Sequence, residues 1–109
     1  MNVKRKGNKG ERELAELLTK AGIMAYRNDQ MYIGGRNNPD VYAEISGQPL
    51  HIEVKRVERL NVPEAVNQAI RDSAEGSFPI VAHRKNRTQW LVTMPLLPLI
   101  AFLKDRGLI

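Results

Sequence analysis

The sequence predicts one α/β domain over residues 1–109, with its elements in the order α-β-β-β-α-β-β-α. Three observations support this fold class. Apolar residues recur at helical spacing in three segments, short apolar runs lie between turn-forming residues, and the chain length suits a single hydrophobic core. Residues 1–9 are rich in Lys and Arg, and we expect them to form a basic arm ahead of the first helix.

The first half of the chain begins with a helix over residues 10–22. Leu14, Leu18 and Ala21 lie on one apolar stripe of this helix, and Gly22 is suited to end it. A short strand over residues 23–28 follows. The next eleven residues, from Asp29 to Pro39, are expected to form a loop because they include two Gly, two Asn and a Pro.

Two strands over residues 40–46 and 50–57 flank the turn-forming sequence SGQP, which predicts a β-hairpin. Asp40 then begins the first arm, and Glu53 and Lys55 lie within the second. The hairpin is therefore expected to bring three charged residues from separate parts of the sequence near one another.

The second half of the chain predicts a helix, two strands and a last helix. A helical pattern runs over residues 61–76, with Pro63 in the first turn, where a helix tolerates it. Apolar runs at 78–84 and 88–94 predict strands around a turn, and residues 95–107 have the composition of a terminal helix.

Composition limits the class of partner. The net charge of +5 and the pI of about 9.8 favour a polyanion, either nucleic acid or an acidic membrane surface. There is no cysteine, which excludes disulfides and Cys-bound zinc. The longest apolar run is interrupted by Pro95 and Pro98, and the first twelve residues lack the apolar core of a secretion signal. We therefore expect no membrane association and a cytoplasmic location, in a bacterial, archaeal or phage-infected cell.

The predicted strand LHIEVKRV contains the candidate catalytic residues. Alternate side chains of a strand point to opposite faces, so His51, Glu53 and Lys55 share one face, and the hairpin brings Asp40 to Glu53. Two adjacent carboxylates repel each other unless a proton or a hard cation lies between them, and Mg²⁺ is typically held by one or two carboxylates. Lys55 could then position an attacking water or neutralise a phosphate. The alternatives are a cross-strand salt bridge on a solvated face and, for His51, a surface or partly packed imidazole.

These residues resemble those of a known superfamily. The "PD" at Pro39 and Asp40, followed by "EVK" from Glu53 to Lys55, resembles the motif of the PD-(D/E)xK nucleases. The upstream sequence "KGNKGEREL" resembles the first helix of the archaeal-type Holliday junction resolvases, and small phage-encoded nucleases of the superfamily are also similar. The resemblance implies a restriction-endonuclease-like fold, with a central mixed sheet flanked by helices.

The resemblance also implies roles for individual residues. Metal ligands would come from Glu11, Asp40 and Glu53, with the Val54 carbonyl lending an oxygen, and Lys55 would be the catalytic lysine. Glu13 competes with Glu11 for the helical position. Gln68 matches a glutamine that several members carry on the helix after the lysine, although ordinary helix surface explains it equally well. The expected cofactor is Mg²⁺, with Mn²⁺ as an alternative.

We thus expect a metal-dependent DNA endonuclease that selects branched or junction DNA and acts as a homodimer, because a four-way junction needs two incisions. A flap or nicking nuclease of phage replication and a non-catalytic DNA-binding module of the same fold are the alternatives. Two basic clusters and three arginines near the site are the expected phosphate contacts, with plain surface charge as the other explanation. They are Lys4, Arg5, Lys6, Lys9, Arg27, Arg36, Arg56, Arg84, Lys85 and Arg87.

Overall fold

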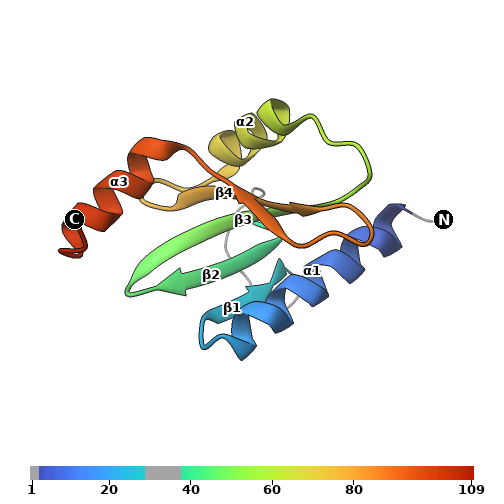
Figure 1. The fold of residues 1–109 in the computed structure, drawn as a ribbon, viewed down its shortest axis with the longest axis horizontal. Coiled ribbons are helices and arrows are strands. Elements are labelled where there is room, and N and C mark those ends of the chain that lie inside the picture. The colour runs from blue at the N-terminus through green and yellow to red at the C-terminus, as the bar shows by residue number, and fades with distance from the viewer. Residues whose placement is uncertain (1–2, 29–37) are drawn as a thin grey trace.

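The computed structural model of the protein describes residues 3–28 and 38–109 and has the element order that the sequence predicts (Figure 1). The strands form one five-stranded sheet, and the helices lie around it. The elements are α1 (Val3–Lys20), β1 (Met24–Arg27), β2 (Val41–Ile45), β3 (Gln48–Arg56), α2 (Val62–Asp72), β4 (Phe78–Arg84), β5 (Leu91–Thr93) and α3 (Leu96–Asp105). No helix of the described segments is long and apolar enough to cross a membrane.

The sheet is mixed, as the resemblance implied. Its strand order is β1-β2-β3-β4-β5, and β3 and β4 run parallel while the other neighbours are antiparallel. The parallel pair is joined through α2, as a parallel connection requires. In the β2–β3 hairpin Val41 pairs with Ile52, so the same register places Asp40 across from Glu53.

Helices cover both faces of the sheet (Figure 1). On one face Leu14 of α1 packs in a core with Val41, Ile52 and Val54. On the other face Ala65 and Ala69 of α2 pack against Val81. The alternate residues of β3, which include Glu53, therefore lie on the α2 side of the sheet.

The helix boundaries differ from the expected ones in two places. The first helix begins at Val3, so residues 3–9 are helical and do not form a separate arm. Because its first turns carry no apolar stripe, hydrophobic periodicity could not reveal them. The second helix ends at Asp72, where Ser73 takes an extended conformation and its backbone N–H caps the Ala69 carbonyl. Gly76 instead occupies a turn, with φ of 87°.

The strand boundaries also move by a few residues. The hairpin turn consists of Ser46 and Gly47, which have φ of 50° and 80°, so Gln48 and Pro49 pair within β3. Such a two-residue turn with positive φ matches the twist of a hairpin. The last strand is limited to Leu91–Thr93, shorter than the expected 88–94.

Candidate active site

Backbone contacts fix Asp40 at the start of β2. Its Oδ2 accepts a hydrogen bond from the Val54 N–H at 2.9 Å, and its carbonyl accepts one from the Asn28 N–H at 3.0 Å. These bonds tie Asp40 to β3 and to the end of β1, the two strands that flank β2 in the sheet. The carboxyl group is therefore already oriented toward Glu53 in the folded chain.

The environment of Asp40 disfavours its charged form. Burial, the charge of Glu53 and, with a smaller effect, the charge of Glu11 together raise its pKa from 3.8 to about 7, against the opposing effect of the Val54 N–H. A hydrogen bond between the two carboxyl groups acts in the same direction. Asp40 and Glu53 thus share a proton near neutral pH, the behaviour of paired acids in a site of low polarity.

Glu53 is the ionised member of the pair. It is 4% exposed, and burial alone would raise its pKa, but hydrogen bonds from His51 and Asp40, with the charge of Lys55, lower it. His51 Nε2 lies 2.7 Å from Glu53 Oε1, and because a carboxylate only accepts, the imidazole donates. His51 is itself 4% exposed. It is therefore a buried partner of the site and not a surface residue.

Lys55 follows on the same face of β3 and is half-buried. Its neighbour in the parallel register is His83 of β4, whose Nε2 lies 2.9 Å from the Thr93 hydroxyl. The structure thus brings Asp40, Glu53 and Lys55 together on one side of the sheet, as the sequence predicted. The salt bridge on a solvated face does not describe Glu53, which is buried and bonded to His51.

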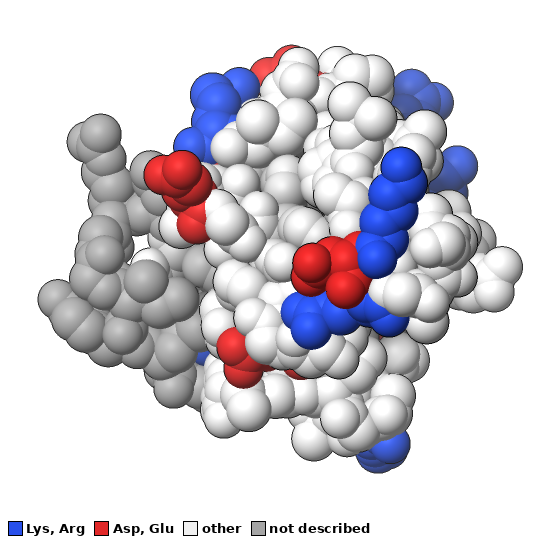
Figure 2. All heavy atoms as spheres, turned by 90° about the vertical axis from the view of Figure 1, so that its left-hand side faces the viewer, with Lys and Arg blue, Asp and Glu red and all other residues white. Residues whose placement is uncertain are grey.

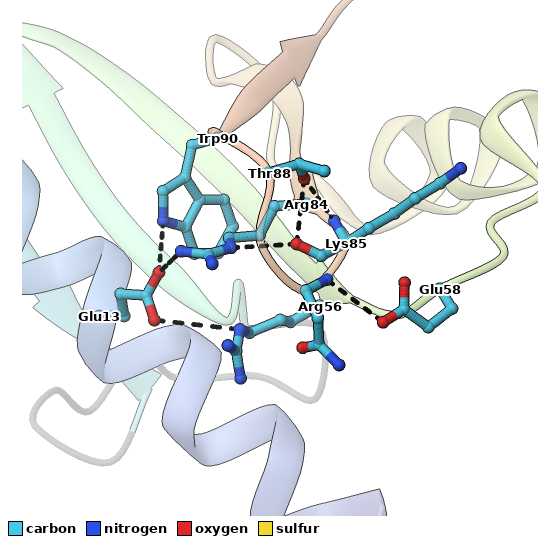
Figure 3. Close-up of polar contacts among 8 residues, drawn as sticks. Glu13, Arg56, Glu58, Arg84, Lys85, Thr88 and Trp90 are labelled. Carbon is cyan, nitrogen blue, oxygen red and sulfur yellow. Dashed lines mark hydrogen bonds and ion pairs between the residues drawn. The ribbon is translucent and has the colours of Figure 1, made fainter.

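The two candidate glutamates of α1, Glu11 and Glu13, have different environments. Glu11 is half-buried, and its charge acts on Asp40. Glu13 instead accepts hydrogen bonds on Oε1 from Arg84 Nη1 and from Trp90 Nε1, the latter at 2.9 Å (Figure 3). Its Oε2 forms an ion pair of 3.9 Å with Arg56 Nε. Of the two, Glu11 is the one whose charge affects Asp40, whereas Glu13 joins α1 to Arg56, Arg84 and Trp90.

The acid pair can receive a hard cation. In the part of the chain that the structure describes, no group of three His, Cys, Asp or Glu side chains is arranged to hold a metal ion. Two carboxyl groups that retain a proton near neutral pH, however, form a site where a cation relieves the repulsion. Mg²⁺ often binds one or two carboxylates and keeps several waters, so the pair suits it.

Gln68 lies on the helix that covers this face of the sheet. It follows Ala65 by one helical turn and adjoins Ala69, and both alanines pack on the sheet, so Gln68 lies toward the side of β3 that carries Glu53. Gln68 is half-buried. A role at the site stays a prediction for this residue.

The expected phosphate contacts fall into three groups. Arg36 lies outside the described residues, and for Lys4, Arg5 and Lys6 only the helical backbone of α1 is described. Arg27, Arg56 and Arg84 are half-buried, and the last two contact Glu13. Lys9, Lys85 and Arg87 are exposed.

Sequence reasoning missed the roles of Glu13 and Trp90. Their contact joins residues 77 positions apart, and Glu13 meets Arg84 across 71 positions. Trp90 is the single tryptophan of the chain, next to a basic cluster, and that was the available signal. Arg84 also lies over its ring, 5.8 Å from the centroid.

The mixed five-stranded sheet with helices on both faces is the fold of the PD-(D/E)xK nuclease class, and Asp40, Glu53 and Lys55 stand at the positions of its sequence motif. The profile of the archaeal Holliday junction resolvase (Hjc) family matches residues 2–98, and the chain belongs to this family. Among solved structures it is similar to the 1.6 Å structure of Archaeoglobus fulgidus Hjc, a Holliday junction resolvase from an archaeal hyperthermophile. The two share 29% identity and a TM-score of 0.55, covering 81% of this chain and 76% of the other. Curated protein sequences give no significant match.

Proposed function

We propose that the protein cuts four-way DNA junctions by Mg²⁺-dependent hydrolysis, with Asp40 and Glu53 as the protein ligands of the ion and Mn²⁺ as an effective substitute. The observation that carries this proposal is the placement of two acids side by side in the sheet, with Glu53 buried and the pKa of Asp40 raised to about 7 by burial and by the charge of Glu53. Such a pair is unfavourable in a metal-free protein above neutral pH. A divalent cation in place of the proton would remove that cost.

Each residue of the set has a chemical part in the proposal. When bound, Mg²⁺ lowers the pKa of water and stabilises negative charge on the phosphate. Lys55 orients the attacking water and neutralises the charge that grows on the phosphate oxygens. Glu11 and the Val54 carbonyl complete the set of oxygen ligands, and the hydrogen bond from His51 keeps Glu53 ionised and oriented. Gln68 supports this set from α2.

The DNA strand is proposed to leave the site along a groove that lies near the end of β3. The groove has a volume of about 550 Å³ and lies between the connection after β3 and the β4–β5 hairpin. His83, the register neighbour of Lys55, lines it together with the cations Arg59 and Lys85. A second hollow, of about 410 Å³ between α1 and β1, is lined by Arg12 and Arg27. Each hollow also contains one acid, Glu58 or Glu16, but the cations outnumber it in both, and this net positive charge favours a phosphate backbone.

We further propose that the protein acts as a homodimer through the end of the molecule formed by α3. Figure 2 faces this end, where charged side chains are scattered and a broad area between them is uncharged. Large apolar side chains are exposed on it, including Leu96 at 64% and Leu97 at 77%. An exposed apolar surface of this kind favours association, and two symmetric sites are needed to cut two strands of a junction. A DNA substrate also implies a cytoplasmic location.

The proposal is tested by cleavage of labelled four-way junction, flap, linear duplex and single-stranded DNA, each with Mg²⁺ or EDTA. Lys55→Ala is the control for contaminating nuclease. We expect paired symmetric cuts in the junction that disappear with EDTA and fall at least about 100-fold in Lys55→Ala, while junction binding persists. Preferential cleavage of flap DNA would instead indicate that the protein is a DNA-processing nuclease. Binding without cleavage of any substrate would assign a non-catalytic module.

A further inference from the structure

The part of α1 that carries Glu11 lies very close to β3. A Cβ added to Gly10 would lie 3.2 Å from the Arg56 Cβ and 3.4 Å from Val54 Cγ1. These distances are tighter than ordinary packing, so the helix backbone and the strand approach each other directly at a position without a side chain. The helical turn of Gly10 and Glu11 is therefore set against the end of β3 that carries Lys55.

Glu13 fastens the same region of α1 to the sheet. Its side chain is 30% exposed, while those of Arg56 and Arg84 are 19% exposed or less. The cluster is therefore partly protected from water, where charge-assisted bonds are stronger than at an open surface. Figure 3 shows Glu13 reaching from α1 to Arg56 on one side and to Arg84 and Trp90 on the other. Both of its carboxylate oxygens have cationic partners.

The partners of Glu13 are adjacent in sequence to the residues of the site. Arg56 directly follows Lys55, and Arg84 directly follows His83, which pairs with Lys55 in the sheet. The cluster thus connects the segment of α1 that carries Glu11 to the ends of β3 and β4, where Lys55 and His83 lie.

We propose that Glu13 is a positioning residue which, through Arg56, Arg84 and Trp90, holds Glu11 at the Asp40–Glu53 pair. The inference rests on the proposed function, because it takes Glu11 as a third ligand of the ion. It also separates the roles of the two glutamates. Glu11 acts on the ion directly, whereas Glu13 acts only through the placement of α1.

Two variants and one control test this role. Glu13→Gln removes the charge, and Trp90→Phe removes the indole N–H donor while it keeps an aromatic ring beneath Arg84. Glu75→Gln makes the same change in net charge at an exposed residue between α2 and β4. We expect Glu13→Gln to weaken Mn²⁺ binding, measured by calorimetry without DNA, by about 10-fold, and to slow junction cleavage at limiting Mg²⁺ similarly. Glu13→Gln should still bind the junction in EDTA as the wild type does. The Glu75→Gln control should match the wild type in every one of these measurements.

A double-mutant cycle distinguishes positioning from general support of the fold. In a Glu11→Gln background, Glu13→Gln should cause no further loss of Mn²⁺ affinity, because the group that it positions is already altered. Independent, additive losses would overturn the proposal, as would wild-type Mn²⁺ affinity in Glu13→Gln. If that variant does not fold, Trp90→Phe decides, since weaker Mn²⁺ binding supports the role and wild-type binding overturns it.

The same experiments separate failure of this inference from failure of the proposed function. An inactive Glu11→Gln variant beside a normal Glu13→Gln variant overturns the positioning role alone. Absence of junction cleavage by the wild-type protein refutes the proposed function. Full activity of Glu11→Gln would show that Glu11 is not a ligand of the ion, and the positioning role of Glu13 would then be overturned as well.

Discussion

Asp40 makes the stability of the metal-free protein depend on pH. Its pKa is about 7 in the folded chain and 3.8 as an ordinary carboxyl, so the fold favours the protonated form. This contribution is fully present below pH 3.8 and is lost as pH rises toward 7. The lowered pKa of Glu53 has the opposite sign, but that group is already ionised over most of this range. A tenfold difference in proton affinity between the folded and unfolded chain corresponds to about 1.4 kcal/mol.

We therefore expect the free energy of unfolding in EDTA to fall by a few kcal/mol between about pH 5 and pH 8. Urea unfolding across this range measures the loss. Mg²⁺ or Mn²⁺ should restore stability at the higher pH, where the ion replaces the proton. Asp40→Asn is the matched control and should lose most of the pH dependence. An equally steep profile in that variant would assign the dependence to other groups.

His51 shows what the strand pattern does and does not predict about a residue. Period-2 alternation correctly placed it on the face of Glu53 and Lys55. Its burial to 4% exposure depends on the elements that cover this face of the sheet, and no local pattern in β3 reports them. The buried carboxylate of Glu53 requires a donor, and His51 supplies it at 2.7 Å.

At the scale of elements, the close approach of α1 and β3 gives a direct test at Gly10. Alanine is a better helix former than glycine by about 1 kcal/mol, so an exposed position would gain stability from this substitution. At Gly10 the new Cβ would instead meet Arg56 at 3.2 Å. We expect Gly10→Ala to lower the free energy of unfolding by about 1–2 kcal/mol in urea titrations. Thr19→Ala, at an exposed position of α1, should be neutral or stabilising. A stabilised Gly10→Ala would show that the strand yields easily.

The order of elements and the hairpin could be predicted because their signals are local. Apolar alternation in β3 and the turn at Ser46 and Gly47 determine the register that brings Asp40 to Glu53. The Glu13 cluster could not be predicted in this way. Its partners come from β3, from β4 and from the connection between β4 and β5, and in the sequence Glu13, Arg56 and Arg84 look like ordinary surface charges. The start of α1 was missed for a related reason, since residues 3–9 are almost all polar and show no apolar periodicity.

At the scale of the whole molecule, the two ends of the elongated domain, 45 Å along its longest axis, differ in character. The basic hairpin turn with Lys85 lies near the end from which α1 starts, and α3 forms the other end (Figure 1). There Phe102 packs edge-on against Phe78 at the start of β4, with 5.6 Å between ring centroids. No residue of α3 is buried, although the helix is rich in leucine. A partner surface is the simplest physical reason to keep such a helix.

The second copy of the chain is the proposed partner, and Leu97 is the residue to test. At 77% exposure its side chain contributes little to the folded monomer, so Leu97→Glu should leave the free energy of unfolding of the monomer nearly unchanged. In a dimer interface of ordinary size, about 800 Å² per partner, an unpaired buried carboxylate costs several kcal/mol. Sedimentation velocity should therefore find a wild-type dimer and a Leu97→Glu monomer.

Ile70→Glu, at an exposed apolar position of α2, serves as the matched control and should remain dimeric. The change in assembly should also alter the products on a four-way junction. A dimer with two sites cuts both strands within one bound complex, whereas a monomer releases singly nicked junctions. If the wild-type protein sediments as a monomer and yet makes paired cuts, the junction must itself bring two copies together. The apolar end would then require another partner, because symmetric cleavage would no longer depend on it.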